Sequence, residues 1–304
     1  MDPMNLIPHG LPISAVERET GIAKDLLRMW ERRYGFPEPA RDDQGDRLYP
    51  REQIDKLRLV RRLMDLGFRP GKVMHLDSDA LERMIDVHEP RREASPSTHD
   101  MVRLLRGRDH YAVRDYLHIQ LDTLGTRPFV CDFLSETIEQ VGSAWMRGEI
   151  EVYEEHLYTE QINRVLREAL ARLAMPAERP RVILTTCPGE QHVIGVLMVE
   201  AMLRLAGCET LAFGPEMPFT DTAHATVKHD ADVVALSFSG AYDGDVQDAT
   251  ASLLELLPPD VELWVGGAGC RGLRSRPRCE VMTELSGIDG IVAAWRARQA
   301  ARQE

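Results

Sequence analysis

The carboxy-terminal part of the chain alternates short apolar runs with helical stretches, and this alternation limits the possible folds most strongly. Strand-like runs lie at residues 181–186, 210–213, 232–237 and 261–265, with helical stretches between them. Strands joined by helices at this spacing form a parallel sheet with helices on both faces. The sequence therefore predicts a Rossmann- or flavodoxin-like α/β domain over residues 180–304.

Two further parts precede this domain. Residues 1–82 contain two short helical segments separated by a Thr-Gly turn, followed by a hairpin-like turn and a longer helix. Residues 83–98 are polar, contain proline and lack periodicity, which is typical of a linker. Residues 99–176 carry apolar side chains at helical spacing, which predicts a small four-helix bundle.

The charge of the chain is unevenly distributed. The net charge is −12, yet residues 1–80 hold 14 basic and 14 acidic side chains, and residues 18–72 hold 14 basic against 10 acidic ones. A locally basic head on an acidic body is compatible with nucleic-acid binding by the head.

The sequence also predicts a cytoplasmic protein with no membrane partner. No apolar run approaches the roughly 20 residues of a membrane span, and the first residues lack a secretory signal. Five cysteines without a Cys-x-x-Cys pair argue against a disulfide framework and against a thiolate zinc site.

Basic side chains in the second helical segment point to DNA. Lys24, Arg28 and Arg32 are spaced by four residues and share one helix face, which could enter a major groove. Spacing alone equally fits a solvated charged face.

The residue pattern favours the first interpretation. Residues 11–75, with the run Arg-Met-Trp-Glu-Arg-Arg-Tyr-Gly at 28–35 and Arg-Leu-Tyr at 47–49, resemble the MerR family of transcription regulators. The resemblance implies a winged helix-turn-helix, a dimer, double-stranded operator DNA with inverted half-sites, and a core position for Trp30. It also implies DNA contacts from Lys24, Arg28 and Tyr34 in the recognition helix, and from Arg41, Arg47 and Tyr49 in the wing.

A histidine follows the first predicted strand of the α/β domain. His192 comes two residues after Glu190, in a loop at the carboxyl end of a parallel strand, where open α/β sheets bind ligands. Such an imidazole can ligate a metal while the carboxylate orients it, although a lone histidine there fits a solvent-facing side chain as well.

The Glu190-x-His192-x-x-Gly195 pattern resembles the signature of proteins that bind cobalamin with its own base displaced. The resemblance implies that His192 is the lower cobalt ligand. Downstream small and hydroxyl residues match the pocket for the displaced nucleotide tail, namely Ser237, Ser239, Gly266 and Gly267.

The helical part completes this resemblance. Taken alone, Trp145 would be a core residue, and Glu155 and His156 would lie on a helix surface. Here all three lie between a MerR-like head and a cobalamin-like tail. The whole order resembles the light-sensing repressors of the CarH and LitR family. It implies adenosylcobalamin, with Trp145 over the adenosyl group and Glu155 and His156 in the same cavity. It further implies an oligomer, dimer or tetramer, that binds operator DNA in the dark and releases it when light breaks the cobalt–carbon bond.

Three points stay open in the sequence. Some members of that family carry a cobalt-capturing histidine after the tryptophan, where this chain has Met146; His156, another histidine or water could take that place. A cobalamin-fold regulator that answers another ligand or a protein partner without light is one rival interpretation. A corrinoid methyl carrier is the other, but the absence of a second catalytic domain and the DNA-binding head argue against an enzyme.

Overall fold

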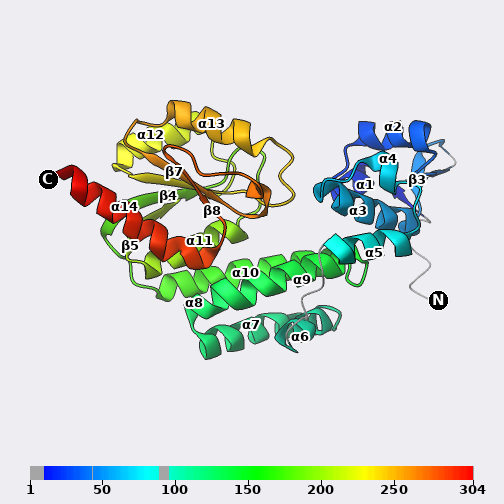
Figure 1. Ribbon diagram of the computed structural model, residues 1–304. Coiled ribbons are helices and arrows are strands. Elements are labelled where there is room, and N and C mark those ends of the chain that lie inside the picture. The colour runs from blue at the N-terminus through cyan, green and yellow to red at the C-terminus, as the bar shows by residue number, and fades with distance from the viewer. Residues whose placement is uncertain (1–9, 43, 89–95, 304) are drawn as a thin grey trace. The chain divides into compact units, whose positions relative to one another are not determined.

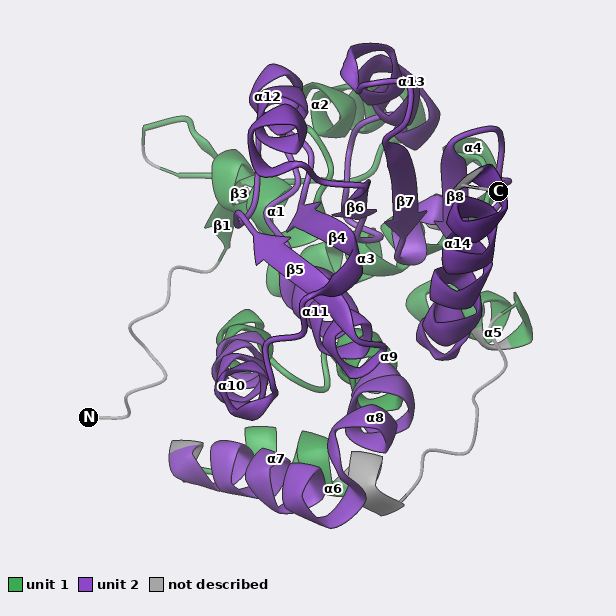
Figure 2. Ribbon diagram, turned by 90° about the vertical axis from the view of Figure 1, so that its left-hand side faces the viewer, with its two compact units in different colours: residues 1–108, 136–156 green, residues 109–135, 157–304 purple. Residues whose placement is uncertain are grey.

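The computed structural model describes residues 10–42, 44–88 and 96–303. The chain forms two compact units, shown in different colours in Figure 2. The first unit comprises residues 1–108 and 136–156, and the second comprises residues 109–135 and 157–304. Each unit has its own hydrophobic core, one in the amino-terminal head and one around a parallel sheet.

The head contains the predicted helix-turn-helix. Helices α1 (Ile13–Thr20) and α2 (Lys24–Tyr34) end at Gly21 and Gly35. Both glycines have a positive φ, 64° and 67°, a conformation that costs glycine nothing and stops a helix. Trp30 is fully buried in the head's core, which confirms its expected structural role.

A small antiparallel sheet forms the wing. Its order is β1-β3-β2, with strands β1 (Leu11–Pro12), β2 (Ala40–Arg41) and β3 (Arg47–Tyr49). The long helix α3 (Arg51–Asp65) follows directly, and its apolar side chains pack into the same core as Trp30. The winged helix-turn-helix predicted for the head is therefore confirmed.

The stretch predicted as a linker, 83–98, is partly helical. After the short α4 (Pro70–Val73), helix α5 (Ser78–His88) continues because Leu81 is buried in the head's core and neighbouring apolar side chains pack against it. Helix α6 (Pro96–Leu105) then begins at a proline, which fits the first turn of a helix. The expected linker residues 89–95 lie outside the described part of the chain.

The middle of the chain is helical, as predicted. It contains α7 (His110–Leu124), α8 (Thr126–Pro128), a π-helical segment (Phe129–Leu134), α9 (Ser135–Met146) and α10 (Val152–Arg172). A glycine at position 148 separates α9 from α10 at the expected point, with a φ of 69°. The segment expected to form one bundle contributes to both units, since residues 136–156 group with the head.

The second unit contains a five-stranded parallel sheet of order β5-β4-β6-β7-β8, which confirms the predicted α/β class. The strands are β4 (Glu178–Thr185), β5 (Cys208–Ala212), β6 (Val233–Ser237), β7 (Glu262–Gly266) and β8 (Cys279–Met282). The edge strand β8 was not predicted, because its four residues carry no long apolar run.

Helices cover both faces of this sheet (Figure 1). Helices α12 (Phe219–His229) and α13 (Val246–Leu256) lie on one face, and α11 (Ile194–Leu205) and α14 (Ile288–Gln303) lie on the other. Strand β4 has β5 on one side and β6 on the other, so successive connections leave it in opposite directions. The carboxyl ends of β4 and β6 are therefore the switch point of the sheet, and doubly wound sheets bind ligands in the crevice at such a point.

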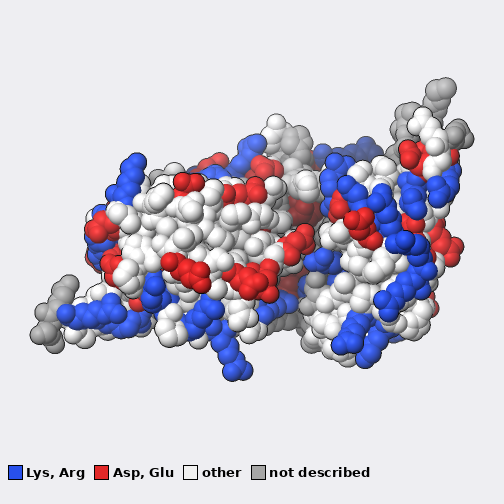
Figure 3. Space-filling model, turned by 90° about the horizontal axis from the view of Figure 1, so that it is seen from above, with Lys and Arg blue, Asp and Glu red and all other residues white. Residues whose placement is uncertain are grey.

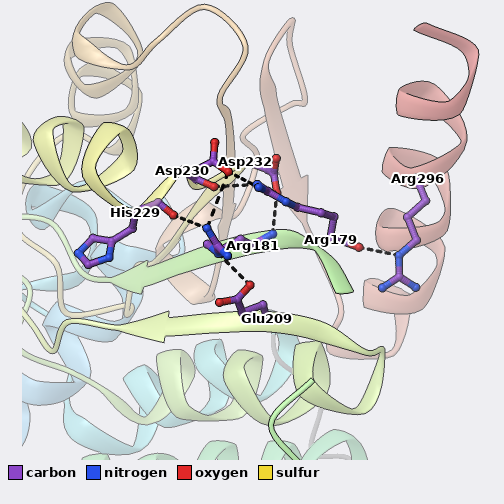
Figure 4. A network of polar contacts seen from close by, with 7 residues as sticks. All are labelled: Arg179, Arg181, Glu209, His229, Asp230, Asp232 and Arg296. Carbon is purple, nitrogen blue, oxygen red and sulfur yellow. Dashed lines mark hydrogen bonds and ion pairs between the residues drawn. The ribbon is translucent and has the colours of Figure 1, made fainter. Parts of the chain in front are cut away.

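A polar network ties together the opposite, amino-terminal edge of the sheet (Figure 4). Arg179 and Arg181, at the start of β4, both contact the segment that leads from α12 into β6; Arg179 Nη1 lies 2.9 Å from Asp232 Oδ2. Arg181 Nε also donates to Glu209 Oε2 on β5 at 2.8 Å. These contacts join β4 to β5 and to the segment before β6 at the amino-terminal edge of the sheet. They leave the carboxyl ends of the strands to other side chains.

No helix among the described residues is both long enough and apolar enough to cross a membrane.

Candidate functional site

Glu190 is the buried centre of the crevice at the carboxyl end of β4. Its side chain is about 1% exposed, and it accepts three hydrogen bonds. The His192 backbone N–H donates to Oε1 at 2.9 Å, and the Ser239 backbone N–H donates to Oε2 at 2.7 Å. The third bond joins Oε1 to Nδ1 of the His192 ring at 2.6 Å. One carboxylate therefore links the loops after β4 and β6.

These bonds keep the Glu190 carboxylate charged. Burial alone raises the pKa of a carboxyl group, but hydrogen bonds from His192 and Ser239 outweigh it and lower the pKa of Glu190 from 4.5 to about 2. An ionised carboxylate only accepts hydrogen bonds, so Nδ1 of His192 must be the protonated ring nitrogen.

His192 is held through one ring nitrogen while its side chain stays 59% exposed. Nδ1 is bonded to Glu190 and lies 3.1 Å from Ser239 Oγ. In a neutral ring with its proton on Nδ1, Nε2 carries the lone pair that can ligate a metal. A carboxylate hydrogen-bonded to the far nitrogen also raises the basicity of a histidine ligand.

Small residues bring the neighbouring elements close together. Ser237 pairs with Gly266 across β6 and β7, so both end at the same edge as Glu190. A Cβ on Gly195, at the start of α11, would lie 2.2 Å from Ser237 Oγ. A Cβ on Gly267 would lie 2.2 Å from the Phe238 backbone oxygen. Only glycine permits these approaches.

The structure thus gathers seven predicted site residues in one place, at the carboxyl ends of β4, β6 and β7. They are Glu190, His192, Gly195, Ser237, Ser239, Gly266 and Gly267. All lie within the second unit, so this part of the predicted site is a single local constellation.

Sequence reasoning missed two members of this crevice, Cys187 and Tyr242. Burial raises the pKa of the Cys187 thiol and of the Tyr242 hydroxyl, and interaction with Cys187 raises the pKa of Tyr242 further. The Tyr242 ring also lies 5.2 Å from the ring of Phe238. An aromatic three residues after Ser239 was the available signal, but nothing in the sequence places it over the loop that contains Cys187.

We expect Gly267→Ala to destabilise the second unit by about 1–3 kcal/mol, the usual cost of a strained backbone. Gly267 has a φ of 100°, and its Cβ would collide with a backbone oxygen that cannot rotate away. Thermal unfolding of the full chain measures this. Gly290→Ala in α14 is the matched control, since its Cβ meets nothing within 4 Å; equal midpoints for both variants would contradict the close packing described above.

The other predicted cofactor residues belong to the first unit. Trp145 lies one residue before the end of α9, and its indole N–H is buried without a hydrogen-bond partner. Glu155 and His156 lie in the first turn of α10, with Glu155 Oε2 2.9 Å from His156 Nδ1. The structure therefore divides the predicted cofactor residues between two units.

The predicted DNA-contacting residues of α2 are accessible. Lys24 Nζ lies 3.0 Å from Glu17, and Arg28 Nη1 lies 3.2 Å from Asp25. Both side chains are close to half exposed, and such surface ion pairs exchange easily for other anions. Figure 3 shows Lys and Arg side chains gathered over the face of the head that carries α2. Tyr34 is half-buried, with the Arg33 guanidinium over its ring.

The wing corrects one expectation. Arg41 is exposed and donates to the Gly45 carbonyl at 2.7 Å, whereas Arg47 is paired with Glu31 at 3.0 Å. Tyr49 is fully buried, and its hydroxyl donates to Glu31 Oε1 at 2.5 Å. Its expected DNA contact is therefore not supported: the side chain joins the wing to α2 inside the core.

Comparisons with known families agree with this division. Residues 11–79 match the model of the MerR HTH family regulatory proteins, and residues 180–292 match that of the B12 binding domain. The sigma subunit of glutamate mutase from Halobacterium salinarum is 29% identical over 123 residues, which cover 40% of this chain and 80% of that subunit.

Two relatives match most of the chain, and both are transcriptional repressors rather than enzymes. The HTH-type transcriptional repressor CarH of Myxococcus xanthus is 28% identical over 260 residues, 83% of this chain and 86% of CarH. The HTH-type transcriptional repressor CarA of the same organism is 31% identical over 231 residues, 75% of this chain and 76% of CarA. With a MerR-type head, a helical middle and a B12-binding α/β domain in the same order, the chain belongs to the family of HTH-type transcriptional repressors that includes CarA and CarH.

Proposed function

We propose that this protein is an adenosylcobalamin-dependent, light-responsive repressor. It binds operator DNA in the dark as an oligomer and releases the DNA after illumination. The observation that carries the proposal is the buried, ionised Glu190 that is hydrogen-bonded to Nδ1 of the partly exposed His192 ring. A single histidine ligand is what a cobalt already held in a corrin ring needs from the protein.

The residues of the crevice fit cobalamin bound with its own base displaced. His192 Nε2 would be the lower axial ligand, and Glu190 would fix the ring through Nδ1. The displaced nucleotide tail would lie against the ends of β6 and β7, where Ser237 and Gly266 leave only small side chains. Glycine and serine at strand ends allow a bulky ligand to approach the backbone closely.

Trp145, Glu155 and His156 would act on the upper face of the cofactor. Trp145 would pack against the adenosyl group, with Glu155 and His156 in the same cavity. An indole ring there offers dispersion contact and excludes water. The cofactor itself supplies a cobalt–carbon bond that visible light breaks; Met146 supplies no imidazole for the cobalt afterwards.

We propose that repression depends on how many heads act together. On this proposal residues 1–82 bind DNA, residues 99–176 cover the cofactor and residues 180–304 bind it. Heads joined in a dimer or tetramer bind with avidity that a single head lacks. A change in residues 99–176 that loosens the oligomer therefore lowers affinity for DNA without any change in the DNA-binding surface.

Absorption spectra of the purified protein test the cofactor assignment. Adenosylcobalamin should bind with the spectrum of the base-off, histidine-ligated form, and green light should change that spectrum irreversibly. Binding of methylcobalamin with methyl transfer to a thiol would instead support a corrinoid carrier. No binding of either form would refute the proposal and leave a regulator whose domain answers another partner.

Arg28→Ala tests the DNA surface. If Arg28 contacts a base edge, the variant should lose about 1–3 kcal/mol of operator binding, whereas loss of a phosphate contact alone would weaken all sequences alike. Binding is measured by fluorescence anisotropy on DNA selected by the wild-type protein. Arg103→Ala is the control, because it removes the same charge from an exposed pair on α6, outside the head's helix-turn-helix; an equal loss in both variants would exclude α2 as the reading helix.

A further inference from the structure

A buried arginine in the head contacts the tryptophan of α9. The Arg58 residue on α3 is 2% exposed. Its guanidinium donates to Asp55 Oδ1 and to Glu19 Oε2, both at 2.8 Å. The guanidinium carbon also lies 5.1 Å from the centroid of the Trp145 ring, within the range of a cation–π contact.

Two neighbouring contacts join the same elements. The Arg51 guanidinium lies 2.7 Å from Glu151 Oε2, in the segment between α9 and α10. A Cβ on Gly148, in the same turn, would lie 3.7 Å from the Asp55 carboxyl carbon. Residues 136–156 accordingly belong to the same compact unit as the head.

The Arg58–Trp145 and Arg51–Glu151 contacts differ in energetic weight. The Arg51–Glu151 pair is exposed on both sides, at 41% and 49%, so it contributes little. The Arg58 charge is buried and its Nε has no hydrogen-bond partner, so the ring of Trp145 is part of what stabilises the guanidinium in place. Arginine is suited to this because its planar group stacks on an aromatic face, which a lysine ammonium cannot do.

We infer that Arg58 is the positioning residue through which the DNA-binding head holds Trp145. The inference rests on the proposed function for one point, that Trp145 covers the cofactor. If the Trp145 ring also packs against the cofactor, as proposed, its contact with Arg58 couples the cofactor to the head. A change that moves the ring alters the position of the head, and a fixed head in turn favours the ring position that the cofactor needs.

The contact itself is tested without any cofactor, by hydrogen exchange of the full chain. Arg58→Lys keeps the charge beside Asp55 and Glu19 but removes the planar face. Backbone amides of residues 144–150 should then exchange more than twofold and up to about 30-fold faster, the upper figure being the full worth of a desolvated cation–π contact. Arg51→Gln is the matched control and should stay within about twofold of wild type. Unchanged exchange in Arg58→Lys would overturn the inference.

A double variant shows whether Arg58 acts through the ring. In a Trp145→Leu background the planar partner is already gone, so adding Arg58→Lys should change the exchange of these amides by less than about twofold. Full additivity of the two substitutions would mean that Arg58 acts elsewhere, and would also overturn the inference. The double variant also separates loss of the contact from general unfolding. General unfolding would make Arg58→Lys speed up amide exchange equally in wild type and in the Trp145→Leu background.

The coupling is tested with adenosylcobalamin and the DNA selected by wild type. Arg58→Lys should keep the cofactor spectrum. The ratio of dark to illuminated DNA affinity should be at least about fivefold smaller in this variant than in wild type. A wild-type difference retained in full would contradict the coupling. If wild type itself shows no difference, the proposed function fails and the coupling with it, while the exchange experiment alone decides whether Arg58 holds Trp145.

Discussion

His192→Ala is expected to weaken adenosylcobalamin binding by about 100-fold or more. Loss of a residue that merely orients a metal ligand costs about 10- to 100-fold, and His192 would be the ligand itself. Its ring is held at Nδ1 by the buried Glu190, and its side chain is 59% exposed. Spectrophotometric titration measures the affinity and shows whether an imidazole is bound to cobalt.

The control is a second exposed histidine of the same domain. His224→Ala on α12 removes an imidazole away from the crevice and should leave affinity and spectrum unchanged. Thermal unfolding of both variants shows whether the domain is intact, since His192→Ala also frees one acceptor site on Glu190. An unchanged spectrum in His192→Ala would exclude it as the lower ligand.

Trp145→Ala is expected to abolish the response to light while cobalamin binding falls less than in His192→Ala. The proposed lower ligand, His192, belongs to the other unit of the chain, so we expect cofactor retention and light response to be separable. The variant should form the dark oligomer weakly or not at all, measured by size-exclusion chromatography with adenosylcobalamin in the dark and after illumination. Loss of the ring can also cost up to about 3–5 kcal/mol of stability, the range for truncating a large aromatic in a core.

A tryptophan elsewhere separates these two effects. Trp295 on α14 is 5% exposed, so Trp295→Ala should cost stability through loss of packing while the light-dependent change in size persists. If Trp145→Ala switches as wild type does, Trp145 is a packing residue only. Met146 adds a reading from the same samples, because illuminated wild type should lack a stable two-imidazole cobalt spectrum unless another histidine moves in.

The sequence predicted those parts of the fold that local patterns determine. Gly21 and Gly35 end the two head helices because they accept a positive φ, and Gly148 separates α9 from α10 for the same reason. The alternation of strands and helices predicted the parallel sheet, and Glu190-x-His192 predicted a pair that the structure joins by a hydrogen bond.

Long-range packing accounts for what the sequence did not reveal. Tyr49 matches a DNA-contacting position of the family by its place in the sequence. Its hydroxyl is instead bonded to Glu31, 18 residues earlier, and that pairing cannot be read from local sequence. Helix α5 extends into the expected linker because Leu81 finds a place in the head's core. The contact of Arg58 with Trp145 joins residues far apart in the chain, and no spacing rule relates them.

The light response is decided by the DNA affinity of one adenosylcobalamin-loaded sample, measured in the dark and again after green light. We expect tight binding to the selected operator in the dark and a loss of at least about tenfold after illumination, the scale on which avidity acts. The oligomer should become smaller in the same sample. Equal affinity before and after light, with the cofactor bound and photolysed, would exclude a light-responsive repressor and leave a cobalamin-binding repressor that does not respond to light.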